Sequence, residues 1–238
     1  MRNLKRALSL AVASVMLLGM MVVGSGAVSY DDVTSEHNTE AIEVLQAIGA
    51  MVGDGESFNP DQNVTREEMA VIMCNLLDYT VSSYQGLTRF TDVSDWARPY
   101  VEACYTNSII AGYSDTQFGG SDPVTTGQAG LMIMKALGYF QEMGDFGADW
   151  LVATVRQGSQ IQLFEGVTNG ANEALTRNDV AQMVLNALQA ESVQIVSHDL
   201  VSDGMGGFTT KAIYDGRPAV TAWNNIKNAD TRRGLQLG

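Results

Sequence analysis

The chain opens a helix in the same way three times. Each opening is a branched apolar residue followed by threonine, at Val64-Thr65, Val124-Thr125 and Leu175-Thr176. The threonines lie 60 and then 51 residues apart. The apolar positions that follow have the spacing of one buried helix face: Met69, Ile72, Met73 and Leu76; Ala129, Met132, Ile133 and Ala136; Val180, Met183, Val184 and Ala187. Such tandem units bury their apolar faces against their neighbours, so we expect three helical units with a shared core.

The start of each of these helices has the sequence of a capping box. The pairs are Thr65 with Glu68, Thr125 with Gln128 and, in a weaker form, Thr176 with Asp179. In this arrangement the threonine accepts a hydrogen bond from the N3 N–H and the N3 side chain accepts one from the N-cap N–H. A structural role is therefore sufficient to explain the three threonines.

An aromatic and acidic opening and a second helix precede each of these starts. The openings are Tyr30-Asp31-Asp32-Val33, Phe90-Thr91-Asp92-Val93 and Phe146-Gly147-Ala148-Asp149. Helices are expected over residues 41–48, from residues 94–97 to Tyr105, and from Asp149 through Val152 and Val155. In the first two copies the helix-joining loop contains one phenylalanine, Phe58 or Phe118, which we expect to plug the core below it. The predicted fold class is mainly α.

The first 27 residues are predicted to be an export signal. Arg2, Lys5 and Arg6 precede an apolar run over residues 7–23, and Ser25-Gly26-Ala27 is a small-residue cleavage site. A membrane anchor is the competing interpretation, but the run is shorter than the ~20 residues of a membrane span. We expect the mature chain to begin near Val28, with no membrane span, and to lie at the cell surface.

Charge and composition narrow the classes of function. The formal charge of −13 becomes −16 once the three cations of the signal are removed. An acidic chain of this kind does not suit nucleic acid or anionic lipid as a partner. His37 and His198 are the only histidines and stand in no catalytic or metal-ligand pattern, and there is no phosphate-binding glycine loop. We therefore predict no enzyme, no cofactor and no metal, although a glycosidase pair among the many carboxylates stays open.

Cys74 and Cys104 are the only cysteines, and both lie in apolar helical stretches. One interpretation is a pair of buried thiols that act as small apolar side chains. The other is a disulfide between repeats, which an exported chain permits.

Two arginines are the first candidates for ligand binding. Arg66 and Arg177 stand at the first helical position, where the helix dipole disfavours a cation. With free helix N–H groups, such an arginine forms a clamp for an anion; the second copy has Thr126 instead. The clamp predicts that replacing either arginine weakens binding and leaves stability unchanged. The alternative is an internal salt bridge, whose loss lowers stability and leaves binding intact.

Exposed aromatic and acidic side chains would complete a sugar site. Trp96 and Trp150 stand beside Asp95 and Asp149 at the start of the first helix of copies two and three. A tryptophan face with neighbouring carboxylates suits a sugar ring and its hydroxyls, although a tryptophan here also packs well in a core. Asp32 and Asp92 of the openings complete the candidate ligand-binding set.

Residues 191–238 do not continue the repeat. Strands are expected at residues 192–196 and 208–214 around a glycine-rich turn at residues 202–207. The segment is interpreted as a short β-like tail or as the start of a truncated further domain.

Together these motifs resemble the S-layer homology domain over residues 29–190. The matching motifs are Phe90-Thr91-Asp92-Val93 with Trp96-Ala97, the loop from Gly112 to Phe118, and Val64-Thr65-Arg66-Glu67-Glu68. The resemblance implies repeats at residues 28–80, 88–140 and 144–190, packed as a pseudo-threefold spindle with grooves between neighbours. It implies non-covalent anchoring to secondary cell-wall polysaccharide, typically pyruvylated, or to another peptidoglycan-linked glycan. The alternatives are a self-assembling surface lattice without direct glycan binding and, less favoured, a cell-wall hydrolase.

The chain departs from the family pattern in each copy. Thr126 replaces the arginine of copy two, Glu36 stands at the tryptophan position of copy one, and copy three lacks the usual loop. Binding is therefore expected at one or two grooves that combine residues of different copies.

Overall fold

The computed structural model describes residues 30–86 and 88–215. These residues form α-helices α2 (Thr39–Ala47), α3 (Arg66–Leu77), α4 (Arg98–Thr106), α5 (Thr126–Ala136), α6 (Trp150–Gln160) and α7 (Arg177–Gln189), short 3-10 helices η1 (Val81–Tyr84) and η2 (Met143–Phe146), and strands β1 (Ile195–Ser202) and β2 (Phe208–Tyr214). The prediction of a mainly α fold is confirmed. The predicted export signal at residues 1–27 lies outside the described residues.

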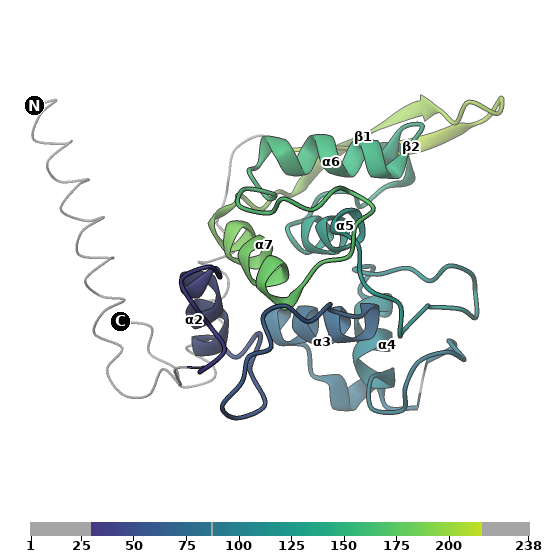
Figure 1. The fold of residues 1–238 in the computed structure, drawn as a ribbon. Coiled ribbons are helices and arrows are strands. Elements are labelled where there is room, and N and C mark those ends of the chain that lie inside the picture. The colour runs from purple at the N-terminus through teal and green to yellow at the C-terminus, as the bar shows by residue number, and fades with distance from the viewer. Residues whose placement is uncertain (1–29, 87, 216–238) are drawn as a thin grey trace, which may run out of the picture.

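The helices pack across the boundaries between copies (Figure 1). Helix α3 packs against α4, α5 against α6, and α7 against α2. Each of these pairs joins the second helix of one copy to the first helix of another. Residues that are distant in the sequence therefore meet at three junctions, and a site at a junction takes its side chains from two copies.

Main-chain hydrogen bonds link the three helix openings in a closed ring. The N–H of Val64 donates to the carbonyl of Leu175 at 3.0 Å, that of Leu175 to Val124 at 3.0 Å, and that of Val124 to Val64 at 2.8 Å. Side chains from all three copies form one buried apolar cluster around this ring. The ring fixes the three openings relative to one another, so the copies are not separate units on linkers.

The capping boxes are present at all three starts. Both reciprocal hydrogen bonds form in each, and the helices begin one residue after the threonine, at Arg66, Thr126 and Arg177. The pair of Thr176 and Asp179, expected to be weaker, has hydrogen bonds of 2.7 to 3.2 Å. The short aspartate therefore reaches the N-cap as well as Glu68 does.

The predicted core is largely confirmed. The apolar side chains expected inside are buried: Met69, Ile72, Met73, Val180, Met183 and Val184. Phe58 and Phe118 are also fully buried below their loops. Copy three differs, because Val152 is exposed and α6 turns Thr154 and Gly158 inward. The ring of Phe164 packs against the inward face of α6 at Gly158. A side chain at Gly158 would clash with it, because a Cβ there would lie 2.3 Å from the ring.

The C-terminal strands form an antiparallel hairpin. The second strand is where the sequence predicted it, but the first runs over Ile195–Ser202 and not over residues 192–196. Its extent is set by pairing with β2, in which Ser202 lies opposite Phe208. Asp145 of η2 holds the hairpin, since its carboxylate accepts the N–H of Ala212 at 2.8 Å and the hydroxyl of Tyr214 at 2.5 Å. Figure 1 shows the hairpin crossing the side of the molecule that carries α6.

Within the described residues, none of the helices has the length and apolar character that crossing a bilayer requires.

Candidate binding site at the junctions between repeats

The N-termini of the long helices are closed by main-chain contacts. At the start of α3, the N–H of Arg66 donates to the carbonyl of Asp122 at 2.9 Å, and that of Glu67 to Gly120 at 3.1 Å. At the start of α7, Arg177 donates to Gln62 at 2.8 Å and Asn178 to Pro60 at 2.9 Å. The helix N–H groups that the predicted clamp requires are therefore already hydrogen-bonded to a neighbouring copy. An anion at this end has only side chains to bind.

The Arg66 side chain reaches into the loop of copy two. Its Nε donates to the carbonyl of Phe118 at 3.0 Å and its Nη2 to that of Ala111 at 2.9 Å. The guanidinium carbon lies 4.6 Å from the ring centroid of Tyr113 and 4.5 Å from that of Phe118. Only 3% of the residue is exposed. Arg66 therefore stabilises the junction between copies one and two through main-chain acceptors and ring faces.

Arg177 repeats this arrangement against the loop of copy one. Its Nε donates to the carbonyl of Phe58 at 2.7 Å and its Nη2 to that of Val52 at 2.9 Å, while the guanidinium lies 4.5 Å from the Phe58 ring centroid. Arg177 is only partly buried, in contrast to Arg66. Burial lowers the pKa of both guanidinium groups, and nearby tyrosine and carboxylate groups offset part of this effect.

The salt-bridge alternative for the two arginines is wrong. In the part of the chain that the structure describes, no carboxylate lies within ion-pair distance of Arg66 or Arg177. Because arginine stays protonated even when it is desolvated, both positions carry a positive charge. Among the described residues its hydrogen bonds go to carbonyl groups, and carboxylates act on it only from beyond ion-pair distance. These partners could not be predicted from residue types, because they are main-chain carbonyl groups that any residue supplies.

Asp32 and Asp92 hold the loops of the first two copies. The carboxylate of Asp32 accepts the N–H groups of Phe58 at 2.9 Å and Asn59 at 2.7 Å. Asp92 accepts those of Phe118 and Gly119, both at 2.8 Å. Burial alone would raise the pKa of each carboxyl group, but these N–H donors outweigh it and hold the pKa below its usual range. Each carboxylate therefore has a structural role in the loop next to an arginine.

This lowered pKa predicts an acid-dependent loss of stability. The contribution of Asp92 is complete above its unfolded-state pKa and disappears as pH falls through the lower folded-state value. We expect the wild-type free energy of unfolding to fall between about pH 5 and pH 2, and to fall less in Asp92→Asn. Urea unfolding at a series of pH values measures this. Asp95→Asn is the control, because Asp95 accepts no loop N–H, and an equal pH dependence of Asp92→Asn and wild type would contradict the prediction.

The two tryptophans are exposed and do not pack into the core. Trp96 is 54% exposed and Trp150 is 42% exposed. Beside them, Asp95 lies 3.0 Å from Arg98 in an ion pair, and Asp149 caps α6 by accepting the N–H groups of Leu151 at 2.8 Å and Val152 at 3.1 Å. The tryptophan rings are thus accessible to a ligand.

One junction contains an arginine, a tryptophan and two aspartates of the candidate set. The carboxylate of Glu67 accepts the hydroxyl of Ser94 at 2.8 Å and its N–H at 3.1 Å. This contact holds the segment with Asp95 and Trp96 next to the start of α3. We call the start of α3 with residues 90–122 the first junction; it contains Arg66, Asp92, Asp95 and Trp96.

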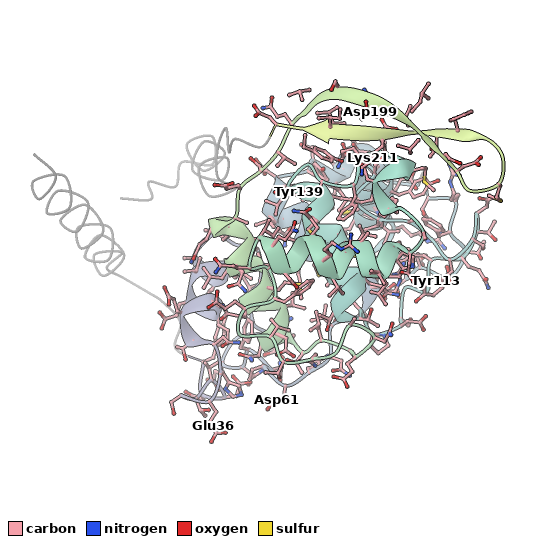
Figure 2. All side chains as sticks on the ribbon, turned by 90° about the horizontal axis from the view of Figure 1, so that it is seen from above. Glu36, Asp61, Tyr113, Tyr139, Asp199 and Lys211 are labelled. Carbon is pink, nitrogen blue, oxygen red and sulfur yellow. The ribbon has the colours of Figure 1, made fainter. Side chains whose placement is uncertain are left out.

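The other two junctions are each incomplete. At the second junction, where the start of α5 meets residues 146–174, Trp150 is present but Thr126 replaces the arginine. At the third, where the start of α7 meets residues 30–62, Arg177 and Asp32 are present but Glu36 replaces the tryptophan. Figure 2 shows Tyr113 of the first junction and Glu36 of the third on well-separated parts of the molecule.

Sequence reasoning missed three residues of the first junction. Tyr113 covers the guanidinium of Arg66, and Glu67 with Ser94 joins the two copies. Glu67 was assigned only to the helix start, and its burial at 5% exposure depends on a segment 27 residues away. Among the described residues, no group of His, Cys, Asp and Glu is arranged to hold a metal ion.

Comparison with known proteins gives a family and several surface proteins. The sequence profile of the S-layer homology domain matches residues 29–70 and 89–129. The chain is 28% identical over 162 residues to the middle cell wall protein of Brevibacillus brevis (66% of this chain, 15% of that protein) and 26% identical over 164 residues to the surface layer protein of Brevibacillus choshinensis (67% and 14%). An endoglucanase of Bacillus sp. is 29% identical over 109 residues (42% and 12%).

The chain thus spans about a seventh of the length of the first two relatives. The profile covers the openings, loops and helix starts that build the first junction, including Arg66, Asp92 and Trp96. Over these two segments, the chain matches the S-layer homology domain.

Proposed function

We propose that this chain anchors an exported protein to the cell wall by binding secondary cell-wall polysaccharide of the pyruvylated kind. S-layer homology domains bind cell-wall polymers in general, and the relatives are named as cell-wall and surface-layer proteins. The family and these relatives indicate a secreted protein at the cell surface. The endoglucanase match covers 12% of that enzyme, and we transfer no catalytic activity from it.

We infer that three repeats, at residues 28–80, 88–140 and 144–190, form a pseudo-threefold spindle. The ring of hydrogen bonds through Val64, Val124 and Leu175 supports this arrangement, as does the packing of each second helix on a first helix of another copy. Three similar junctions follow from it, and we propose that the ligand binds between neighbouring copies.

The observation that carries the proposed function is the charge of Arg66, which in the described part of the chain has carbonyl and ring contacts but no carboxylate within ion-pair distance. A guanidinium has five N–H donors, and the structure assigns one on Nε and one on Nη2 to carbonyl groups. A carboxylate on the ligand, such as that of a pyruvate ketal, supplies the counter-ion that the described chain does not. Trp96 then offers a ring face to the sugar, and Asp95 accepts its hydroxyls.

The first junction is the principal site under this proposal. The second junction, with Trp150 and Asp149, has no cation, and the third, with Arg177 and Asp32, has no tryptophan. We propose weaker binding at both.

Replacing the two tryptophans one at a time tests the assignment. We expect Trp96→Ala to weaken wall binding about tenfold, which corresponds to the loss of one sugar–ring contact. Trp150→Ala is the matched control and should bind nearly as wild type does, because its junction lacks an arginine. Both rings are exposed, so neither change should unfold the protein. The measurement is co-sedimentation with purified cell-wall sacculi over a range of protein concentrations.

The same assay with chemically treated sacculi identifies the ligand group. Removal of pyruvate should lower wild-type binding to the level of the Trp96→Ala protein or below it. Unchanged binding after this removal would rule out a pyruvate carboxylate as the ligand. Equal binding by both tryptophan variants and wild type would remove the first junction as the site.

A surface lattice is the second candidate, and the hairpin favours it. Leu200, Met205 and Phe208 expose large apolar side chains around its free end. Such a patch suits contact with another protein surface. Light scattering on the purified protein separates the two functions: concentration-dependent assembly without binding to sacculi would support the lattice and contradict the anchor.

A further inference from the structure

Cys74 and Cys104 face each other between the two helices that join copies one and two. Cys74 lies on α3 of copy one and Cys104 on α4 of copy two, and their sulfur atoms are 3.4 Å apart. Both residues are buried, with 2% and 0% exposure. Two thiols from different copies are thus in contact in the interior, between α3 and α4.

The helices hold both sulfur atoms in this position. Cys74 Sγ lies 3.4 Å from the carbonyl oxygen of Tyr100 on α4, and Cys104 Sγ lies 3.4 Å from that of Ala70 on α3. Each thiol therefore points at the opposite helix, and the two sulfur atoms meet across the interface. A disulfide has an S–S distance of about 2.05 Å, so closure requires an approach of little more than 1 Å.

We infer that Cys74 and Cys104 are a cross-linking site, which a disulfide-type oxidant closes into a covalent bond between copies one and two. The oxidant is a small disulfide such as oxidised glutathione, or the disulfide of a thiol oxidoreductase. One cysteine thiolate attacks the oxidant and releases the first thiol. The other cysteine then attacks this mixed disulfide, so that an S–S bond forms within the chain and a second thiol leaves. The chain loses two hydrogen atoms, and the oxidant is reduced to two thiols.

The burial of the site determines when the bond forms. A mixed disulfide with glutathione does not fit between α3 and α4 in the folded chain, where neither sulfur is exposed. The contact with Cys74 and burial both raise the pKa of Cys104, which disfavours the reactive thiolate in the folded state. The bond is therefore expected to form while the exported chain folds, and to resist reduction afterwards. The oxidising exterior of the cell permits this chemistry.

Refolding in a defined redox buffer tests the cross-link. The full chain is unfolded in guanidinium with reductant and refolded with reduced and oxidised glutathione. We expect a monomer that is two hydrogen atoms lighter, and a tryptic digest in which residues 67–89 are joined to residues 90–135. The melting temperature should rise by about 5–10 °C over the reduced protein. Dithiothreitol should reverse this rise only when denaturant is present.

Cys104→Ala is the matched control, because it removes one thiol and keeps Cys74. Its melting temperature should not depend on the redox buffer. If this variant does not fold, the linked tryptic fragments of the wild-type chain still decide the question. Two titratable thiols per wild-type molecule after oxidative refolding, or disulfides only between molecules, would overturn the inference.

Discussion

Replacing Arg66 with alanine is expected to lower the free energy of unfolding by about 3–5 kcal/mol. The change removes both donors to the carbonyls of Phe118 and Ala111, and these acceptors lose their partner at a closed junction. It also removes a cation from between two aromatic rings. Urea unfolding followed by circular dichroism measures the loss. The anion clamp alone predicted unchanged stability, and the main-chain contacts are the reason to expect otherwise.

Arg177→Ala is the internal comparison for this result. Arg177 makes the same two types of hydrogen bond but is only partly buried. After its removal, water can hydrogen-bond to the exposed carbonyl acceptors. We expect a smaller loss, of about 1–3 kcal/mol. An unchanged stability of Arg66→Ala, or a larger loss in Arg177→Ala than in Arg66→Ala, would contradict the structural role described here.

Binding must be compared at equal folded fraction, because Arg66 serves both the fold and the proposed site. Arg66→Lys helps to separate the two, since lysine keeps the charge but does not reproduce the planar fork of a guanidinium. We expect this variant to recover part of the stability and only part of the wall binding. Full binding by folded Arg66→Ala protein would show that the cation is structural alone.

The local parts of the fold were predictable because short stretches of sequence determine them. The capping boxes and the apolar spacing gave the starts of α3, α5 and α7 and their buried faces, since both depend on residues three or four positions apart. Phe58 and Phe118 were predictable as loop plugs because each is a lone aromatic residue in a polar turn. These features are confirmed, except that Leu76 and Ala136 of the predicted faces are only half-buried.

The assembly of the site was not predictable in the same way. The partner of α3 is α4 of the next copy, and the contact of Glu67 with Ser94 joins the start of α3 to the segment that carries Trp96, although the two belong to different repeats. Each repeat taken by itself lacks part of the set, and only the packing of copies shows that one junction is complete. The acceptors of Arg66 and Arg177 are main-chain carbonyls, which have no residue-specific signal. The starting point of β1 was missed because cross-strand register, and not local composition, determines it.

Phe118→Ala is expected to destabilise the chain by about 3–5 kcal/mol. The ring is fully buried, lies 5.5 Å from the Phe90 ring centroid and has the guanidinium of Arg66 4.5 Å from its own. Its removal leaves a cavity between two copies, in addition to the lost transfer free energy. Phe208→Ala removes the same atoms from a side chain that is 76% exposed, and should change stability by less than about 0.5 kcal/mol.

The Phe118→Ala variant also tests whether the buried ring of Phe118 positions the proposed site. The main chain of Phe118 contacts two residues of the proposed site: its N–H donates to the Asp92 carboxylate, and its carbonyl accepts from Arg66 Nε. Without the ring the loop loses the packing that positions both groups, and the Arg66 guanidinium loses one of its two aromatic neighbours. We therefore expect folded Phe118→Ala protein to bind sacculi several-fold more weakly than Phe208→Ala protein. The reason is that a displaced guanidinium must be reoriented on binding, which costs free energy. Equal binding by the two folded variants would mean that the loop does not position Arg66 for a ligand.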